Sequence, residues 1–198
     1  MISKQNKAAE RALIGLDDRS HRFFDRYADT APVQALDLFS KLGDQPALRL
    51  LGGGLILAGT FTGRGRLVRA GARVIIAHEA ATFAKNAVKA QVDRTRPRSA
   101  SSRSDKKPRK GQRTDKEETS FPSGHSAGAI AAARAFAREF PEYGAAATTA
   151  AAAIALSQIP RCAHYPTDVA AGLAVGLVAE ALTNAAWNAA KIDERSTP

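Results

Sequence analysis

The amino-acid sequence predicts an all-α protein, an antiparallel helical bundle with about five membrane-embedded helices. Of its 198 residues, 44% are hydrophobic but only 6% are aromatic, and much of the apolar content is alanine, which favours helix. Several apolar stretches also approach the length of about 20 residues (range about 17–25) that a helix needs to cross a bilayer. The mean hydropathy of −0.24 keeps a water-soluble helical bundle open as the alternative.

Residues 1–46 are expected to form a polar, amphipathic arm, with a short helix over 32–42. The domain that follows spans 47–190, and residues 191–198 form a C-terminal tail. Within the domain, apolar stretches predict helices over 47–61, 67–88, 124–140, 145–159 and 169–190. The last two approach or meet the length of a membrane span, whereas the first is short and the second is interrupted by charged residues.

A loop over residues 90–120 interrupts the apolar pattern with many Lys and Arg among Ser, Pro, Gly and Asp. We expect it to be a solvated basic loop, in which 99–118 is a charge run without a specific ligand. Arg94 and Arg98 are expected to face solvent or lipid headgroups. The net charge of +10 indicates anionic partners, such as phosphates, anionic lipid or nucleic acid.

Two histidines lie where helices are predicted to begin. His125 follows Ser123 and Gly124, which are typical of a helix N-terminus, where free N–H groups and the positive end of the helix dipole bind anions. His164 precedes the last helix, and Asp168 four residues later can reach its ring and select its tautomer.

Antiparallel connectivity brings three separated motifs to one end of the bundle. The second predicted helix ends near Lys89, the third begins at His125, and the fourth returns the chain to His164 on the same face. Lys89, Arg96 and Arg161 are expected to bind the non-reacting oxygens of a phosphate.

These groups can cleave a phosphate ester without a metal. His164 is the candidate nucleophile, with Asp168 stabilising the charge that develops on its ring, and His125 is the candidate general acid. Each histidine taken singly could be a capping residue, but the two together with the cations favour catalysis. Because the sequence has no His-x3-His pair or Cys cluster, we expect no metal and no cofactor. Cys162 is expected to be a small filler beside the site.

The motifs resemble the signatures of the type 2 phosphatidic acid phosphatase (PAP2) superfamily, which includes vanadium haloperoxidases and bacterial acid phosphatases. They read Lys89-x6-Arg96-Pro97, then Pro122-Ser123-Gly124-His125, then Ser157 followed by His164-x3-Asp168. The resemblance covers about residues 47–188. It implies an all-helical bundle of PAP2/acid phosphatase type and metal-independent hydrolysis, with His164 as nucleophile and His125 as acid. Ser123 and Gly124 would contact the phosphate.

One position departs from the family pattern. The arginine that usually follows the serine of the third motif is replaced by Gln158, and Arg161 is the candidate substitute for it. If Arg161 fails to replace it, the loss of one such donor costs about 10²–10³ in rate.

The sequence therefore predicts a membrane phosphatase that hydrolyses a lipid phosphate monoester or pyrophosphate through a phosphohistidine. Its partners would be the lipid substrate and membrane lipid, with no nucleic acid. One alternative is a soluble acid phosphatase or haloperoxidase-like enzyme on the same fold. Another is a non-enzymatic basic protein that binds anionic membrane or nucleic acid.

We expect an integral protein of a bacterial-type cytoplasmic membrane, and two indications disagree on the side of its active site. Bacterial lipid phosphatases of the family commonly present the site to the periplasm. The basic loop 89–116 lies on the catalytic face, and the positive-inside rule would place it in the cytoplasm. The sequence indicates neither the particular lipid nor the oligomeric state.

Overall fold

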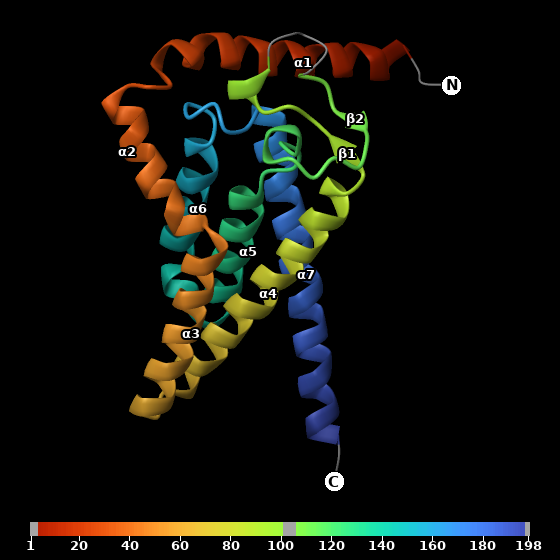
Figure 1. Ribbon diagram of the computed structural model, residues 1–198. Coiled ribbons are helices and arrows are strands. Elements are labelled where there is room, and N and C mark those ends of the chain that lie inside the picture. Colours follow the sequence, from red (N-terminus) through yellow and green to blue (C-terminus); the bar gives the residue numbers. More distant parts are fainter. Residues whose placement is uncertain (1–3, 101–105, 197–198) are drawn as a thin grey trace.

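The computed structural model describes residues 4–100 and 106–196, and most of them are helical (Figure 1). The helices are α1 (Lys4–Phe24), α2 (Ala31–Ser40), α3 (Gln45–Thr62), α4 (Gly65–Lys89), α5 (Gly124–Glu139), α6 (Gly144–Ser157) and α7 (Pro166–Ser196). The strands β1 (Val92–Asp93) and β2 (Arg109–Lys110) form one short antiparallel pair. The all-α class predicted from the sequence is confirmed, and the five helices predicted over 47–190 correspond to α3–α7.

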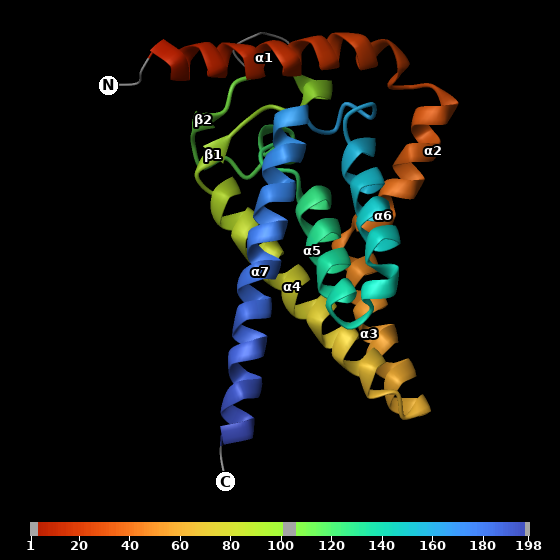
Figure 2. The ribbon, with the colours of Figure 1, turned by 180° about the vertical axis from the view of Figure 1, so that it is seen from behind.

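Helices α3 to α7 run alternately down and up the bundle (Figures 1 and 2), and α5 packs against α4, α6 and α7. Alanine dominates the core around α5, because small side chains allow helix axes to approach closely. A Cβ at Gly172 or Gly176 of α7 would collide with the backbone oxygens of Ser123 and Ala127. Glycine at these two positions therefore lets the start of α7 lie directly against the start of α5.

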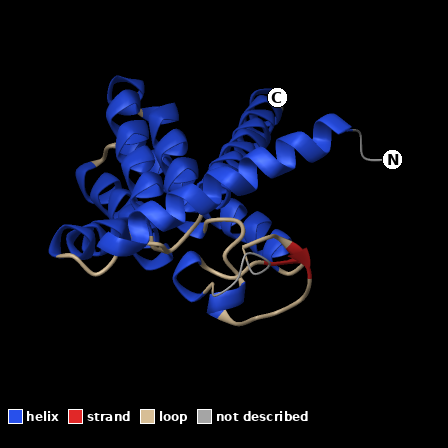
Figure 3. Ribbon diagram, turned by 90° about the horizontal axis from the view of Figure 1, so that it is seen from above, coloured by secondary structure: helices blue, strands red, loops and turns tan. Residues whose placement is uncertain are grey.

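Residues 1–46 contain the helices α1 and α2. Helix α1 lies across the end of the bundle at which α5 and α7 begin (Figures 1 and 3). Its side chain Asp17 is buried and accepts hydrogen bonds from the backbone N–H and the hydroxyl of Thr167, at 3.1 and 2.6 Å. The polar face of α1 therefore docks onto the first turn of α7.

Within the described residues, one helical segment, Pro166–Ala190 of α7, is long and apolar enough to cross a membrane. Only 28% of its apolar window is buried inside the structure. The expectation of about five membrane-embedded helices thus has support from length and composition for α7.

Candidate active site

A cavity of about 310 Å³ lies at the end of the bundle where the predicted motifs meet. It is lined by Gly43, Asp44, Gln45, Pro46, Lys85, Lys89, Arg96, Gly124, His125 and His164. The structure thus brings both histidines to one cavity with Lys89, Arg96 and Gly124. Three other predicted site residues, Ser123, Asp168 and Arg161, lie beside it.

His164 lines the cavity and is buried, with 3% of its surface exposed. Its Nδ1 atom lies 3.7 Å from Oδ2 of Asp168, an ion-pair distance that is longer than a hydrogen bond. Burial lowers the pKa of His164 to about 4, and the charges of Arg96 and Lys89 act in the same direction against Asp168. At neutral pH the ring is therefore uncharged, which is the nucleophilic form of imidazole.

Asp168 is fully buried and held by three donors. Its Oδ1 accepts a hydrogen bond from Arg94 at 2.5 Å, and Oδ2 accepts from the Ser120 hydroxyl at 2.6 Å and the Tyr165 N–H at 2.9 Å. Its backbone carbonyl accepts from the N–H of Ser123 at 3.0 Å. These three hydrogen bonds fix the position of the Asp168 carboxylate beside the His164 ring and favour its charged form.

Arg94 occupies a different place from the one that the sequence suggested. The expectation that it faces solvent or headgroups is wrong, because Arg94 is 1% exposed. Its guanidinium donates to Asp17 at 2.6 Å, as well as to Asp168, and lies 4.1 Å from the centre of the Tyr165 ring. Two buried carboxylates require a buried cation, and Arg94 supplies it. Arg98, by contrast, has an exposed side chain that pairs with Asp29.

The start of α5 supplies the second histidine. Ser123 is its N-cap, and its buried hydroxyl oxygen accepts from the N–H and the hydroxyl of Ser126, at 3.4 and 2.9 Å. The next two N–H groups, of Gly124 and His125, belong to the first turn, which an α-helix leaves without intrahelical acceptors. Nε2 of His125 lies 2.7 Å from Oδ1 of Asp44.

Two lysines of α4 and one arginine face the cavity. Burial, together with the positive charges of Arg96 and Lys85, lowers the pKa of Lys89 to about 7. Lys89 donates a hydrogen bond to the carbonyl of Thr119. Arg96 donates to the carbonyls of Lys116 and Ala163, at 2.7 and 3.1 Å. The cavity wall is therefore strongly cationic and partly shielded from water.

Arg161 lines a neighbouring cavity of about 490 Å³, which shares Arg96 with the first. It donates hydrogen bonds to Oε1 of Gln158 at 2.8 Å and to Asp37 of α2. Gln158, at the position of the family's arginine, is fully buried and donates to the carbonyl of Ile154 at 3.1 Å. Gln158 thus holds the Arg161 side chain in the neighbouring cavity and not in the one that both histidines line.

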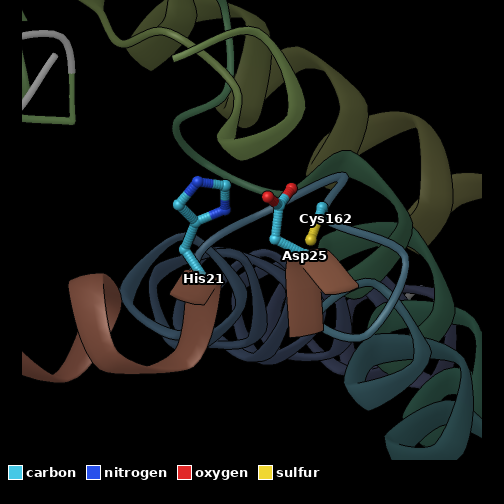
Figure 4. A group of neighbouring side chains, drawn as sticks. All are labelled: His21, Asp25 and Cys162. Atoms are coloured by element: carbon cyan, nitrogen blue, oxygen red, sulfur yellow. The ribbon is translucent and has the colours of Figure 1, made fainter. Parts of the chain in front are cut away.

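Sequence reasoning missed two charged residues that line the cavity, Lys85 and Asp44. Lys85 precedes Lys89 by one helical turn, so both fall on one face of α4, and this spacing was the available signal. Asp44 precedes α3 and meets His125 only through tertiary packing, which no local pattern indicates. The structure also brings His21 and Asp25 to the buried thiol of Cys162 (Figure 4).

This all-α bundle presents two histidines and a set of cations to one cavity, and residues of these types are suited to binding an anion. The chain belongs to the PAP2 superfamily, whose family model matches residues 70–191, from α4 into α7.

Two curated relatives match part of the chain. The lipid A 1-phosphatase of Rhizobium etli is 47% identical over 57 residues, which make up 29% of this chain and 25% of that protein. The lipid A 1-phosphatase of Rhizobium johnstonii is also 47% identical over 57 residues, 29% of this chain and 23% of that protein. The chain therefore spans about a quarter of the length of the curated relatives it matches. No solved structure matches the chain.

Proposed function

We propose that this protein is a phosphatase that hydrolyses a lipid phosphate monoester or pyrophosphate through a phosphohistidine on His164. The observation that carries the proposal is the meeting of His125 and His164 in one cavity lined by Lys85, Lys89 and Arg96. Membership of the PAP2 superfamily and the similarity to lipid A 1-phosphatases support the same reaction class.

In the first step, Nε2 of His164 forms a bond to phosphorus while the bond to the leaving oxygen breaks. Nδ1 faces Asp168, whose charge stabilises the positive ring of the phosphohistidine. His125 donates its proton to the leaving oxygen. A water molecule then attacks phosphorus, gives its proton to His125, and releases phosphate with His164 restored. Side chains of the chain provide every group in this scheme, so the proposed reaction requires no metal.

The cations stabilise the charge on the transferring phosphoryl group. Lys85, Lys89 and Arg96 approach the cavity from α4 and the loop that follows it, and Gly124 lets the phosphate approach the first turn of α5, where a Cβ would lie 3.3 Å from the Lys85 side chain. Ser123 acts through the helix cap that orients this turn. Arg161 contributes longer-range positive charge from the neighbouring cavity.

The proposed location is a bacterial-type cytoplasmic membrane, with α3–α7 in contact with lipid. Large apolar side chains support this, since Phe61 of α3, Phe83 of α4 and Leu182 of α7 are 86%, 78% and 66% exposed. Exposed apolar surface of this extent indicates an interaction with membrane or protein. The basic loop would collect anionic lipid at the bilayer surface, at about 1 kcal/mol for each Lys or Arg close to it.

The test is release of inorganic phosphate by the full chain in detergent from phosphatidate, a prenyl pyrophosphate, phosphatidylglycerol phosphate and lipid A. We expect His164→Ala to abolish release and His125→Ala to slow it by about 10²–10⁴-fold. Acid-labile labelling of the protein by ³²P-substrate should disappear in His164→Ala. His78→Ala is the matched control, because His78 lies in α4 outside the cavity. Turnover retained in His164→Ala would refute the mechanism.

Membrane sedimentation separates this proposal from a soluble enzyme on the same fold. We expect the protein to pellet with membranes and to stay there through high-salt and alkaline carbonate washes. Release by carbonate would favour the soluble or peripheral enzyme. Salt-dependent binding of vesicles without phosphate release would favour a non-enzymatic basic protein.

A further inference from the structure

A second group of reactive side chains lies outside the cavity, where the end of α1 meets the loop before α7. His21 belongs to the last turn of α1, Asp25 to the turn that follows, and Cys162 to the loop between α6 and α7. Their imidazole nitrogen, carboxylate oxygen and sulfur all lie within 4.8 Å of one another (Figure 4). None of the three lines the cavity that contains His125 and His164.

Two of these three groups place a buried atom at the cluster. Nδ1 of His21 is buried and has no hydrogen-bond partner among the described residues. In Figure 4 this nitrogen lies on the edge of the ring that faces Asp25 and Cys162. The Cys162 side chain is 1% exposed and forms no disulfide. A buried, unpaired nitrogen is costly, and a ligand between the three groups would remove that cost.

The chemistry of the three groups selects the ligand. Thiolate, imidazole and carboxylate together are the donors that Zn²⁺ takes, whereas Mg²⁺ and Ca²⁺ require oxygen donors. Bonds of about 2.0–2.3 Å in a tetrahedron place the donor atoms about 3.3–3.8 Å apart. Small rotations of side chains that already lie within 4.8 Å reach this spacing.

The surroundings explain how such an ion would enter. Asp25 is exposed, so the group is open to solvent on one side, and a water molecule can take the fourth position. Burial and the nearby Asp25 carboxylate raise the pKa of Cys162 to about 11, so the metal-free thiol is protonated. A divalent cation reverses this preference, and Cys162 would release its proton to water as the sulfur–metal bond forms.

We propose that His21, Asp25 and Cys162 bind one zinc ion that ties the end of α1 to the loop carrying His164. Cys162 lies two residues before His164, and its backbone carbonyl accepts a hydrogen bond from the N–H of Arg98 at 3.2 Å. The ion would hold α1 and this loop together without touching the substrate. The proposal is independent of the phosphatase activity.

Cobalt substitution of the full chain tests this site directly. The protein, purified in detergent and stripped with a chelator, is titrated with Co²⁺ while near-ultraviolet absorption is recorded. Because the chain has a single cysteine, a thiolate-to-cobalt charge-transfer band reports Cys162 alone. We expect one equivalent to saturate the band, Zn²⁺ to displace it, and Cys162→Ser to abolish it.

Asp25 is the exposed ligand of the three, so the Asp25→Asn variant should fold normally. Asp25→Asn and His21→Ala should weaken Co²⁺ binding by more than the roughly 10–100-fold that loss of an outer-shell partner costs. Asp29→Asn, another exposed carboxylate four residues further on, should leave it unchanged. One equivalent of Zn²⁺ should raise the Tm of the unsubstituted protein but not of Asp25→Asn. Absence of the band, or equal affinity in Asp25→Asn and Asp29→Asn, would overturn the proposal.

Discussion

The buried guanidinium of Arg94 offers the sharpest test of how the site is held together. It links Asp17 of α1 to Asp168 of α7, and all three side chains are buried. The Arg94→Met substitution keeps a side chain of similar length but removes the charge. Asp17 and Asp168 then remain buried without the cation that pairs with them. Breaking a buried ion pair in this way costs about 3–5 kcal/mol, a large share of the roughly 5–15 kcal/mol that stabilises a typical protein.

This cost should be visible in thermal unfolding followed by circular dichroism in a fixed detergent. For a chain of this size, 1 kcal/mol shifts Tm by about 2–4 °C, so we expect Arg94→Met to lower Tm by about 6–20 °C. Arg98→Met is the matched control, because that side chain is exposed and surface changes usually stay within about 0.5 kcal/mol.

A double-mutant cycle separates the ion pair from simple loss of packing. The Asp17→Asn substitution removes one of the two buried carboxylates. In that background, Arg94→Met should lower the free energy of unfolding by less than it does in the unsubstituted chain. Strictly additive effects, or a Tm change in Arg94→Met no larger than that of Arg98→Met, would refute the reasoning.

Three further predictions concern the cavity and the arginine beside it. Burial lowers the pKa of Lys89 to about 7, so the side chain is charged below and neutral above that pH. KM for a phosphate substrate should rise as pH increases through 7, and Lys89→Arg should flatten this dependence; a flat profile in the unsubstituted enzyme would contradict the assignment. Asp44→Asn should lower kcat by up to about 10²-fold with little change in KM, because misplacement of His125 costs about this much; an unchanged kcat would show that Asp44 does not position the ring. Arg161→Ala should raise KM and lower kcat, whereas Gln158→Arg should not increase activity, because it removes an acceptor of Arg161 and adds a like charge. Higher turnover in Gln158→Arg would mean that Arg161 is no substitute for the missing motif arginine.

The sequence by itself determined the helices and the end of the bundle where the motifs meet. Apolar stretches bounded by Gly and Pro set the ends of α3–α6 to within two residues and the start of α7 to within three, whereas α7 continues six residues beyond the predicted end at 190. Connectivity alone then required the starts of α5 and α7 to share a face with the end of α4. His125, His164 and Lys89 were therefore predicted to share one site, and they line one cavity.

Only the tertiary structure decided which polar side chains turn inward and what they meet. Arg94 lies in a basic loop and is nevertheless buried between two carboxylates, one of them 77 residues away in the chain. Asp44 meets His125 only because the turn before α3 packs on the start of α5. The direction of a side chain depends on partners that are remote in sequence, and local residue patterns do not indicate which partners these are.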